Sequence, residues 1–147
     1  MVKRKPLLLD DDIEVRQAEG KGLGVFAMRL LAQGQMVGRY EGIIRSNRTF
    51  EWALERQMTT GLYAFQLSSG SYVDGEDAAR SSWTRYINHA PTGASANVAP
   101  FGRGRPFIYF ETVRDVEAGE ELCFDCELGM LLERVSRSFC TSLLCRN

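Results

Sequence analysis

The sequence predicts a mainly β domain, and three observations support this fold class. Short runs of alternating or continuous apolar residues recur along the chain, and turn-forming residues separate them at short intervals. One segment in the first hundred residues has good helical periodicity. The 147 residues, of which 44% are hydrophobic, suit a single domain with a buried core. We therefore expect short strands, small sheets and a few short helices.

The first expected element is a pair of short strands. Apolar residues alternate over 13–15 and cluster at 25–27, and the glycine-rich segment 19–24 between them is typical of a tight loop. A turn at 32–35 then leads into a longer strand, which is expected to run over 36–44.

A short amphipathic helix is expected next. Phe50, Leu54 and Met58 recur every four residues, which places them on one helical face. Asn47 is the candidate N-cap, and the segment 59–61 is expected to end the helix.

A β-hairpin is expected after the helix, with strands at 62–67 and 71–74 around the turn 68–70. The stretch 77–85 is too short and mixed to assign. Further elements follow in order: a loop at 90–95, strands at 107–110 and 122–125 joined through a turn at 117–119, and a closing helix over 128–139.

The charge balance argues against a nucleic-acid ligand. Lys and Arg number 18 against 19 Asp and Glu, so the chain does not supply the broad cationic surface that a phosphate backbone requires. The apolar run 7–9 is far too short for a signal peptide or a membrane span, so we expect a soluble intracellular protein with no membrane contact. The basic segment 3–6 is either a nuclear-import patch or a solvated tail.

All four cysteines lie between Cys123 and Cys145. Without a secretory signal they are not interpreted as a disulfide framework. Their spacing loosely resembles a four-thiolate zinc site, but Cys123 and Cys126 fall in an expected strand, where residues three apart point to opposite faces. We therefore expect no metal site, and a small zinc-stabilised domain is the weakest alternative.

Two short motifs are the most informative part of the sequence. They are Arg-Tyr-Ile-Asn-His at 85–89 and Gly-Glu-Glu-Leu-Cys-Phe-Asp-Cys at 119–126, separated by one long hairpin. Four further motifs precede them: Gly22-Leu23-Gly24, Tyr40-Glu41-Gly42, Tyr63-Ala64-Phe65 and Tyr72-Val73-Asp74. In this order, the motifs resemble those of the SET-domain protein lysine methyltransferase family over about residues 13–127.

The resemblance implies a SET-domain fold of the β-clip type for the whole chain, 1–147. The core would cover about 13–127, and the closing segment 128–147 would be threaded through a loop as a pseudoknot-like segment. The implied activity is S-adenosylmethionine-dependent N-methylation of a protein lysine, in a histone or another protein. A histone substrate would favour the nucleus over the cytoplasm. The peptide would bind by strand addition in a groove between Asp74 and Phe107.

The resemblance also implies roles for individual residues. Cofactor contacts fall to the main chain of Lys21, Gly22, Leu23 and Gly24 and to Tyr63, Arg85, Tyr86, Asn88 and His89. The reaction centre would hold Tyr40 and Cys126, and the lysine channel Phe65, Asp74 and Phe124. Each feature also has a plainer interpretation. The glycines could form an ordinary hairpin loop, and the single histidine could be structural. The aromatic residues could belong to the core, with Tyr63 and Phe65 alternating on one strand so that their side chains share a face.

The reaction accounts for these residue types. A lysine amine, with an ordinary pKa of about 10.4, must lose its proton before attack, and an apolar channel favours the neutral form. The sulfonium loses its charge during in-line displacement, so catalysis depends mainly on alignment of the reacting atoms. Aromatic faces also attract methylated ammonium groups.

Two departures from the family pattern leave a second function open. Cys126 stands where the family has tyrosine, and losing one preorganised polar group costs about 3 kcal/mol, on the order of a hundredfold in rate. Cys126 is not interpreted as a nucleophile, because His89 belongs to the cofactor segment and no other base is at hand. Ala90-Pro91, Cys140 and Cys145 do not match the zinc cluster of many members. The alternative is therefore a catalytically weakened SET-like protein-interaction module.

Overall fold

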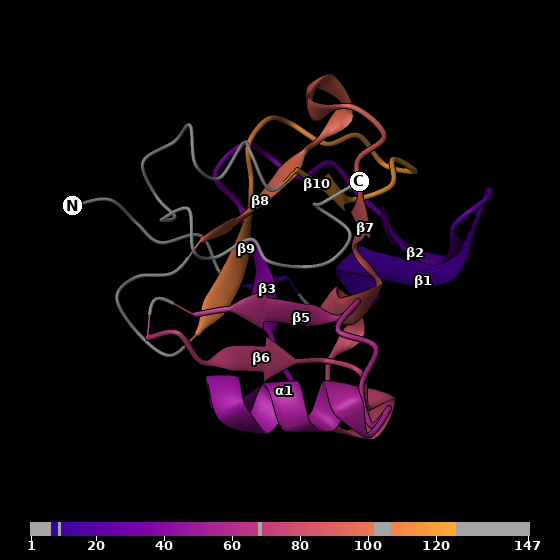
Figure 1. Cartoon of the computed structure of the whole chain (residues 1–147). Helices are drawn as coiled ribbons and strands as arrows, with labels where there is room; N and C mark the ends of the chain where they lie inside the picture. Colours follow the sequence, from indigo (N-terminus) through magenta and orange to yellow (C-terminus); the bar gives the residue numbers. More distant parts are fainter. Residues whose placement is uncertain (1–6, 9, 68, 102–106, 126–147) are drawn as a thin grey trace.

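The computed structural model describes residues 7–8, 10–67, 69–101 and 107–125. Within these residues, ten strands form three sheets, with one α-helix and four short 3₁₀ helices (Figure 1). The prediction of a mainly β chain with small sheets is confirmed. The strands are β1 (Ile13–Ala18), β2 (Gly22–Ala27), β3 (Met36–Tyr40), β4 (Ile43–Arg45), β5 (Ala64–Gln66), β6 (Tyr72–Asp74), β7 (Asn88–His89), β8 (Val98–Phe101), β9 (Ile108–Thr112) and β10 (Cys123–Phe124). The helices are α1 (Asn47–Glu55), η1 (Asp10–Asp12), η2 (Ala78–Arg80), η3 (Trp83–Tyr86) and η4 (Gly93–Ser95).

The first sheet is the N-terminal hairpin of β1 and β2, which confirms the expected pair of strands. The strands are antiparallel, with Ile13 opposite Ala27 and Ala18 opposite Gly22. The connecting loop needs left-handed backbone at Gly20 and Gly22, whose φ angles are 71° and 74°, and glycine adopts this conformation at no steric cost.

The second sheet, called here the central sheet, has the strand order β3-β9-β8-β10-β7 within the described residues. The expected long hairpin is present as β8 and β9, which are antiparallel. β10 is parallel to both of its neighbours, β8 and β7, so the last described strand lies between two strands that precede it in the sequence. This pairing brings the two most informative motifs side by side, with Cys123 opposite Asn88 and Phe124 opposite His89.

The expected single strand over 36–44 is wrong. β3 ends at Tyr40, and β4 starts at Ile43 in a different sheet. The chain turns at Gly42, where a Cβ atom would collide with the carbonyl group of Asp74 and lie 2.8 Å from the backbone nitrogen of Gly75. The absence of a side chain therefore lets β3 and β4 leave this corner in different sheets.

The third sheet, called here the helix-backed sheet, has the order β4-β6-β5, and α1 lies beneath it in Figure 1. The predicted hairpin of β5 and β6 is confirmed, in shorter form. Phe50 of α1 stacks on Tyr72 of β6 with a ring separation of 4.1 Å. The helix is thus anchored by an aromatic pair as well as by its buried Ala53.

Both predicted ends of α1 are wrong. Ser46 is the N-cap, and its hydroxyl accepts a hydrogen bond from the Thr49 N–H at 3.1 Å, whereas Asn47 is already the first helical residue. The helix ends at Glu55, so Met58 lies outside it and is 53% exposed. The four-residue apolar repeat of Phe50, Leu54 and Met58 continues past Glu55, where the helix ends.

One buried cluster joins the three sheets. It contains Val25 of the N-terminal hairpin, Phe110 of the central sheet and Val73 of the helix-backed sheet. The segment before β10 runs beside β2: Ala27 N–H donates to the Glu120 carbonyl at 2.9 Å and Leu122 N–H to the Val25 carbonyl at 2.7 Å. This segment therefore ties the glycine-rich hairpin to the central sheet.

Several predictions fall outside the described residues. Cys126 and the closing segment 128–147, with its expected pseudoknot and helix, are among them.

The unassigned stretch 77–85 contains η2 and most of η3. No helix in the described part of the chain is both long enough and apolar enough to cross a membrane.

Candidate functional site

An aromatic cluster surrounds Tyr40 at the end of β3. The Tyr40 ring lies 4.7 Å from Phe65 and 6.2 Å from Phe110, and both pairs meet edge to face. Phe124 lies 5.5 Å from Phe65 and 5.7 Å from Phe110. The central sheet thus contributes Tyr40, Phe110 and Phe124, and β5 contributes Phe65. Three of the residues predicted for the reaction centre and the lysine channel come together here.

The Tyr40 hydroxyl has a fixed hydrogen-bond direction. It donates to the Tyr63 carbonyl at 2.6 Å, and the same carbonyl accepts the Gly75 N–H at 2.8 Å. Burial raises the pKa of Tyr40 far above its ordinary value, although the positive charge of Arg85 partly opposes the increase. The phenol is therefore neutral, and its proton is directed to the Tyr63 carbonyl. The phenol oxygen can still accept a hydrogen bond from a ligand.

A cavity of about 290 Å³ leads to Tyr40. It is lined by Arg39, Tyr40, Glu41, Gly42, Ile44, Val73, Arg80 and Phe107. Ile44 is 55% exposed, and its strand β4 is an edge of the helix-backed sheet within the described residues. Edge strands of this kind can pair with an added peptide strand.

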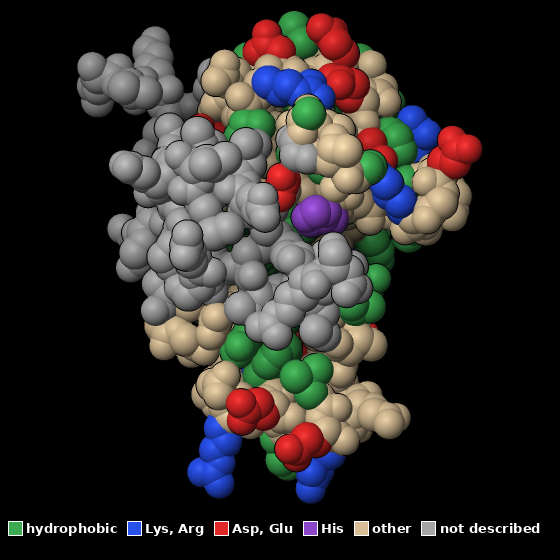
Figure 2. Space-filling view, turned by 45° about the horizontal axis from the view of Figure 1, so that its top comes forward, with side chains coloured by type: hydrophobic (Ala, Val, Ile, Leu, Met, Phe, Trp, Pro, Cys, Tyr) green, Lys and Arg blue, Asp and Glu red, His purple; other side chains and the backbone are tan. Residues whose placement is uncertain are grey.

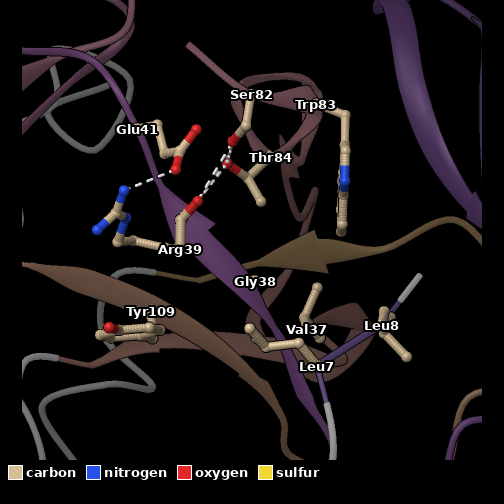
Figure 3. A pocket seen from close by; sticks show the side chains of 10 residues that line it. All are labelled: Leu7, Leu8, Val37, Gly38, Arg39, Glu41, Ser82, Trp83, Thr84 and Tyr109. Carbon is tan, nitrogen blue, oxygen red and sulfur yellow. Dashed lines mark hydrogen bonds and ion pairs between the residues drawn. The ribbon is translucent and has the colours of Figure 1, made fainter. Parts of the chain in front are cut away.

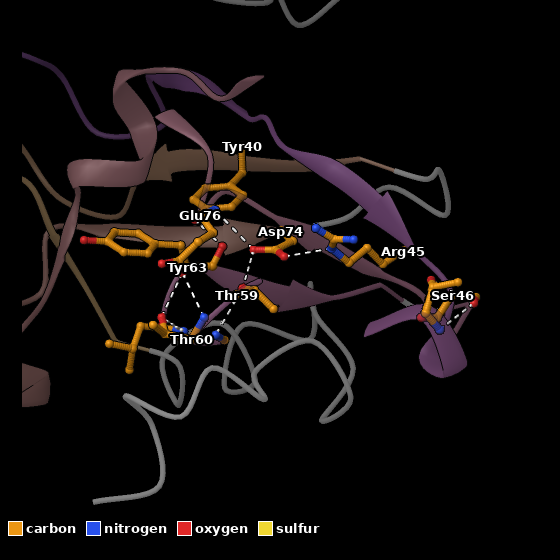
Figure 4. A network of polar contacts seen from close by, with 11 residues as sticks. Tyr40, Arg45, Ser46, Thr59, Thr60, Tyr63, Asp74 and Glu76 are labelled. Atoms are coloured by element: carbon orange, nitrogen blue, oxygen red, sulfur yellow. Dashed lines mark hydrogen bonds and ion pairs between the residues drawn. The ribbon is translucent and has the colours of Figure 1, made fainter. Parts of the chain in front are cut away.

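Asp74 is not among the residues that line this cavity, although it was predicted as a channel residue. Its side chain is buried and forms an ion pair with Arg45 at 2.9 Å. It also accepts hydrogen bonds from the Thr59 hydroxyl and the Glu76 N–H, each at 3.1 Å (Figure 4). Asp74 thereby ties β4 and β6 to the two loops beside Tyr63.

A second cavity, of about 310 Å³, adjoins the first through their shared lining residues Arg39 and Glu41. Trp83 and Tyr109 lie on opposite sides of it (Figure 3). The Arg39 carbonyl on the free edge of β3 accepts hydrogen bonds from the hydroxyls of Ser82 at 3.3 Å and Thr84 at 3.1 Å. These hydroxyls satisfy an edge group that would otherwise be available for pairing with another chain.

The glycine-rich segment contacts Asn88, and the resemblance assigns both to the cofactor site. The Asn88 amide donates to the Leu23 carbonyl at 3.0 Å and to the Glu121 carboxylate at 2.8 Å. A Cβ atom on Gly24 would lie 2.9 Å from the Ala18 Cβ and 2.7 Å from Glu121 Oε1, so glycine leaves room for the Glu121 carboxylate beside Asn88. Exposed backbone groups, a side-chain amide and small residues suit a polar ligand.

Glu121 is a site residue that sequence reasoning did not single out. Its carboxylate pairs with Lys21 at 3.2 Å. Desolvation alone would lower the pKa of Lys21, but its hydrogen bond to the Glu121 carboxylate, with smaller contributions from Cys123, holds that pKa above its ordinary value. The position of Glu121 within the motif 119–126 was the one sequence signal that it belongs to the site. The motif alone does not show that the Glu121 carboxylate accepts a hydrogen bond from Asn88.

His89 connects the Asn88 region to the aromatic cluster. Its ring meets Phe124 edge to face at 5.5 Å, and its Nε2 lies 3.8 Å from the Asp125 carboxylate. The histidine side chain is partly exposed and reaches the surface in Figure 2.

Tyr63 and Arg85 form a separate pair of contacts. The prediction that Tyr63 and Phe65 alternate on one strand is wrong, because Tyr63 lies in the turn before β5. The Arg85 guanidinium instead stacks on the Tyr63 ring at 4.3 Å and donates to the Tyr86 hydroxyl at 3.0 Å.

Within the described residues, no group of three or more His, Cys, Asp or Glu side chains is placed to hold a metal ion. Cys123 is a free, buried thiol. Cys126, Cys140 and Cys145 lie outside the described part of the chain.

Comparison with known families agrees with this arrangement. The model of the SET domain matches residues 22–127, which include the second strand of the N-terminal hairpin, Tyr40, Asn88 and the segment before and through β10. The chain belongs to the SET domain family.

Its SET domain is similar to larger proteins. The variant-silencing SET domain-containing protein of Plasmodium falciparum is 28% identical over 92% of this chain and 6% of its own length. The N-lysine methyltransferase KMT5A-A of Danio rerio is 32% identical over 80% of this chain and 36% of its own length. This chain therefore spans well under half the length of either relative.

A solved structure shows the same fold. The methyltransferase domain of human PR domain-containing protein 2 superposes with a TM-score of 0.63 over 80% of this chain and 78% of that domain, at 23% identity. The expected SET-type β fold is confirmed by this likeness.

Proposed function

We propose that this SET domain transfers a methyl group from S-adenosylmethionine to the side-chain amine of a protein lysine. The observation that carries the proposal is the Tyr40 side chain, which lines a cavity, is buried among aromatic rings and donates its hydroxyl proton to the Tyr63 carbonyl. The similarity to the N-lysine methyltransferase of Danio rerio supports the same kind of reaction.

The cofactor would be held by residues that the fold gathers near the N-terminal hairpin. They are the main chain of Lys21 to Gly24, the amide of Asn88 and the backbone of His89, with Tyr63 and Tyr86 as further lining residues. When bound, S-adenosylmethionine supplies a methyl group made electrophilic by the attached sulfonium. The contact between Asn88 and Leu23 supports this site, because it already holds the two binding segments together.

The chain's own residues would prepare the amine in two ways. Phe65, Phe110 and Phe124 pack against one another beside Tyr40, and this apolar surrounding would favour the neutral, nucleophilic form of a lysine that reaches it. Tyr40 can accept one N–H of that amine, because its own proton is directed to Tyr63. This contact would hold the nitrogen lone pair in line with the methyl group, and alignment is the main requirement of the reaction.

A histone is the favoured protein substrate, with the nucleus as the corresponding location. The name of a further relative, the histone-lysine N-methyltransferase Set8 of Drosophila melanogaster, supports this assignment. The peptide would lie along β4, over the cavity that contains Phe107.

A second candidate function follows from Cys126. A thiol at the position where the family has tyrosine is a shorter and weaker hydrogen-bonding group, so turnover is expected to be slow. The alternative is a SET-like module that binds a protein and has lost most catalysis.

Methyl transfer to mixed histones from isotope-labelled cofactor tests the proposal. We expect incorporation that rises from pH 7 to pH 9 as lysine loses its proton. Tyr40→Phe should lower the rate by about 100-fold, whereas Tyr72→Phe, which alters a ring stacked on Phe50, should leave it unchanged.

Calorimetry with S-adenosylhomocysteine separates the two candidates. Binding with measurable transfer supports the enzyme, and a gain of activity in Cys126→Tyr supports it further. A folded protein that neither binds S-adenosylhomocysteine nor transfers a methyl group at pH 9 would favour the interaction module.

A further inference from the structure

Arg85 fixes the turn that follows β6. Its Nε donates to the Gly75 carbonyl at 2.8 Å and its Nη2 to the Glu76 carbonyl at 2.9 Å. Two consecutive backbone carbonyls therefore converge on one planar guanidinium. Its fork of rigid N–H groups matches such a pair in a way that a lysine ammonium does not.

The same guanidinium holds the neighbouring turn. It stacks on the Tyr63 ring with 4.3 Å between the guanidinium carbon and the ring centroid, and its Nη1 donates to the Tyr86 hydroxyl at 3.0 Å. Nε, Nη1 and Nη2 of Arg85 thus each donate a hydrogen bond to a protein oxygen. Arg85 is half-buried, so these contacts are partly shielded from water.

The two turns held by Arg85 are the turns that hold the Tyr40 hydroxyl. The Tyr63 carbonyl accepts from that hydroxyl at 2.6 Å and from the Gly75 N–H at 2.8 Å. Gly75 also packs directly against the phenol, since a Cβ atom there would lie only 2.7 Å from the Tyr40 oxygen. A displacement of either turn would therefore move the phenol oxygen or remove its acceptor.

We propose that Arg85 is a positioning residue that acts through Tyr63 and Gly75 to aim the Tyr40 hydroxyl at the reacting amine. The inference rests on the proposed methyl transfer, and it gives Arg85 a different role from the cofactor contact that the family resemblance implies. The positive charge of Arg85 is also felt at Tyr40, where it opposes the rise in the pKa of the phenol. Arg85 therefore affects both the direction and the acidity of one hydroxyl.

Arg85→Lys tests the role, because it keeps the charge and removes the fork. The kcat for methyl transfer should fall roughly tenfold to a hundredfold, as expected for a misplaced reacting group. The Kd of S-adenosylhomocysteine, to which the contacted Tyr63 and Tyr86 would contribute, should rise by a much smaller factor. Arg56→Lys is the matched control, since Arg56 also stacks on an aromatic ring, that of Trp52 at 4.5 Å, but caps the C-terminal end of α1, the helix beneath the helix-backed sheet (Figure 1). It should change neither quantity.

Dependence on Tyr40 separates positioning from general loss of structure. In a Tyr40→Phe background, Arg85→Lys should lower kcat much less than in the wild type, because the hydroxyl that it positions is absent. Equal losses in both backgrounds, or a loss of S-adenosylhomocysteine affinity that matches the loss of rate, would overturn the proposal.

A second readout does not require methyl transfer. In protein labelled with ¹³C-tyrosine, the ring signals of Tyr40 are assigned by their disappearance in Tyr40→Phe. Arg85→Lys should shift the Tyr40 and Tyr63 signals and leave those of Tyr72 in place. Unchanged Tyr40 signals would contradict the positioning role, whether or not the wild-type protein transfers a methyl group. A lack of methyl transfer by the wild-type protein would count against the proposed function alone. If Arg85→Lys does not fold, Gly75→Ala should shift the same Tyr40 signals by direct contact, and unchanged signals there contradict the role of the turn.

Discussion

Gly42 controls the path of the chain because no side chain fits at its position. A Cβ atom there would meet the backbone of Asp74 and Gly75, and backbone atoms cannot rotate out of the way. We expect Gly42→Ala to lower the free energy of unfolding by about 2–3 kcal/mol, the usual cost of overpacking. Urea denaturation followed by tryptophan fluorescence measures this change.

Gly70→Ala is the matched control for that variant. Gly70 has a φ of 85° but no atom within 4 Å of its would-be Cβ, so only backbone strain of about 1–2 kcal/mol is expected. A loss in Gly42→Ala no larger than that in Gly70→Ala would contradict the steric role of Gly42.

Cys123 should make stability depend on pH in the alkaline range. Burial, aided by the negative charge of Glu121 and opposed by Lys21, raises the pKa of its thiol from 9.0 to about 11. Below pH 9 the thiol is protonated in both states. Between these two values the unfolded chain loses the proton and the folded chain keeps it, so the free energy of unfolding falls as pH rises. Urea titrations from pH 8 to 11 should show a steeper fall for the wild type than for Cys123→Ala, and identical slopes would refute the assignment.

Residue types in the motifs predicted much of the candidate site. Tyr40, Phe65 and Phe124 meet in one cluster, and Asn88 meets the Gly22 to Gly24 segment. The partners of Glu121 and Arg85 could not be predicted, because each side chain bonds to residues from segments that are adjacent only in the folded chain.

Among the elements, α1 offers the clearest test of local sequence rules. Ser46 and Asn47 are both good capping residues, and the structure selects Ser46, whose hydroxyl accepts from Thr49. We expect Ser46→Ala to lower the free energy of unfolding by about 1 kcal/mol and Asn47→Ala to lower it by less. Thermal unfolding by circular dichroism compares the two variants, and the reverse order would identify Asn47 as the functional cap.

Strand limits were predicted less well than strand existence. The run over 36–44 looks continuous because turning at Gly42 depends on Asp74, thirty-two positions further on. The strands expected from the sequence do not include β8, and Pro100 within it weakens the strand pattern. Pro100 is tolerated because, among the described residues, β10 pairs with β8 only at Val98, which leaves the rest of that side of β8 without a partner strand.

At the scale of the molecule, the proposed cofactor site lies where the N-terminal hairpin meets the central sheet. A ligand that contacts both should therefore stabilise the whole domain. S-adenosylhomocysteine at about 100 times its Kd should raise the free energy of unfolding by about 2.7 kcal/mol. Thermal melting with and without the compound measures the effect.

Asn88→Ala should remove most of this stabilisation, since it removes the amide that bonds to Leu23 and Glu121. Asn47→Ala, which alters an amide on the surface of α1, should retain it. Equal ligand-induced increases in melting temperature for both variants would place the binding site elsewhere.

The position of β10 also affects how the chain is made. During synthesis β7 and β8 leave the ribosome well before Cys123 and Phe124, the strand that joins them. Until then both expose unpaired backbone edges, which are sites for misassociation and for chaperone binding. The proposed cofactor pocket therefore cannot form before this strand has emerged, because Asn88 and Glu121 can meet only then.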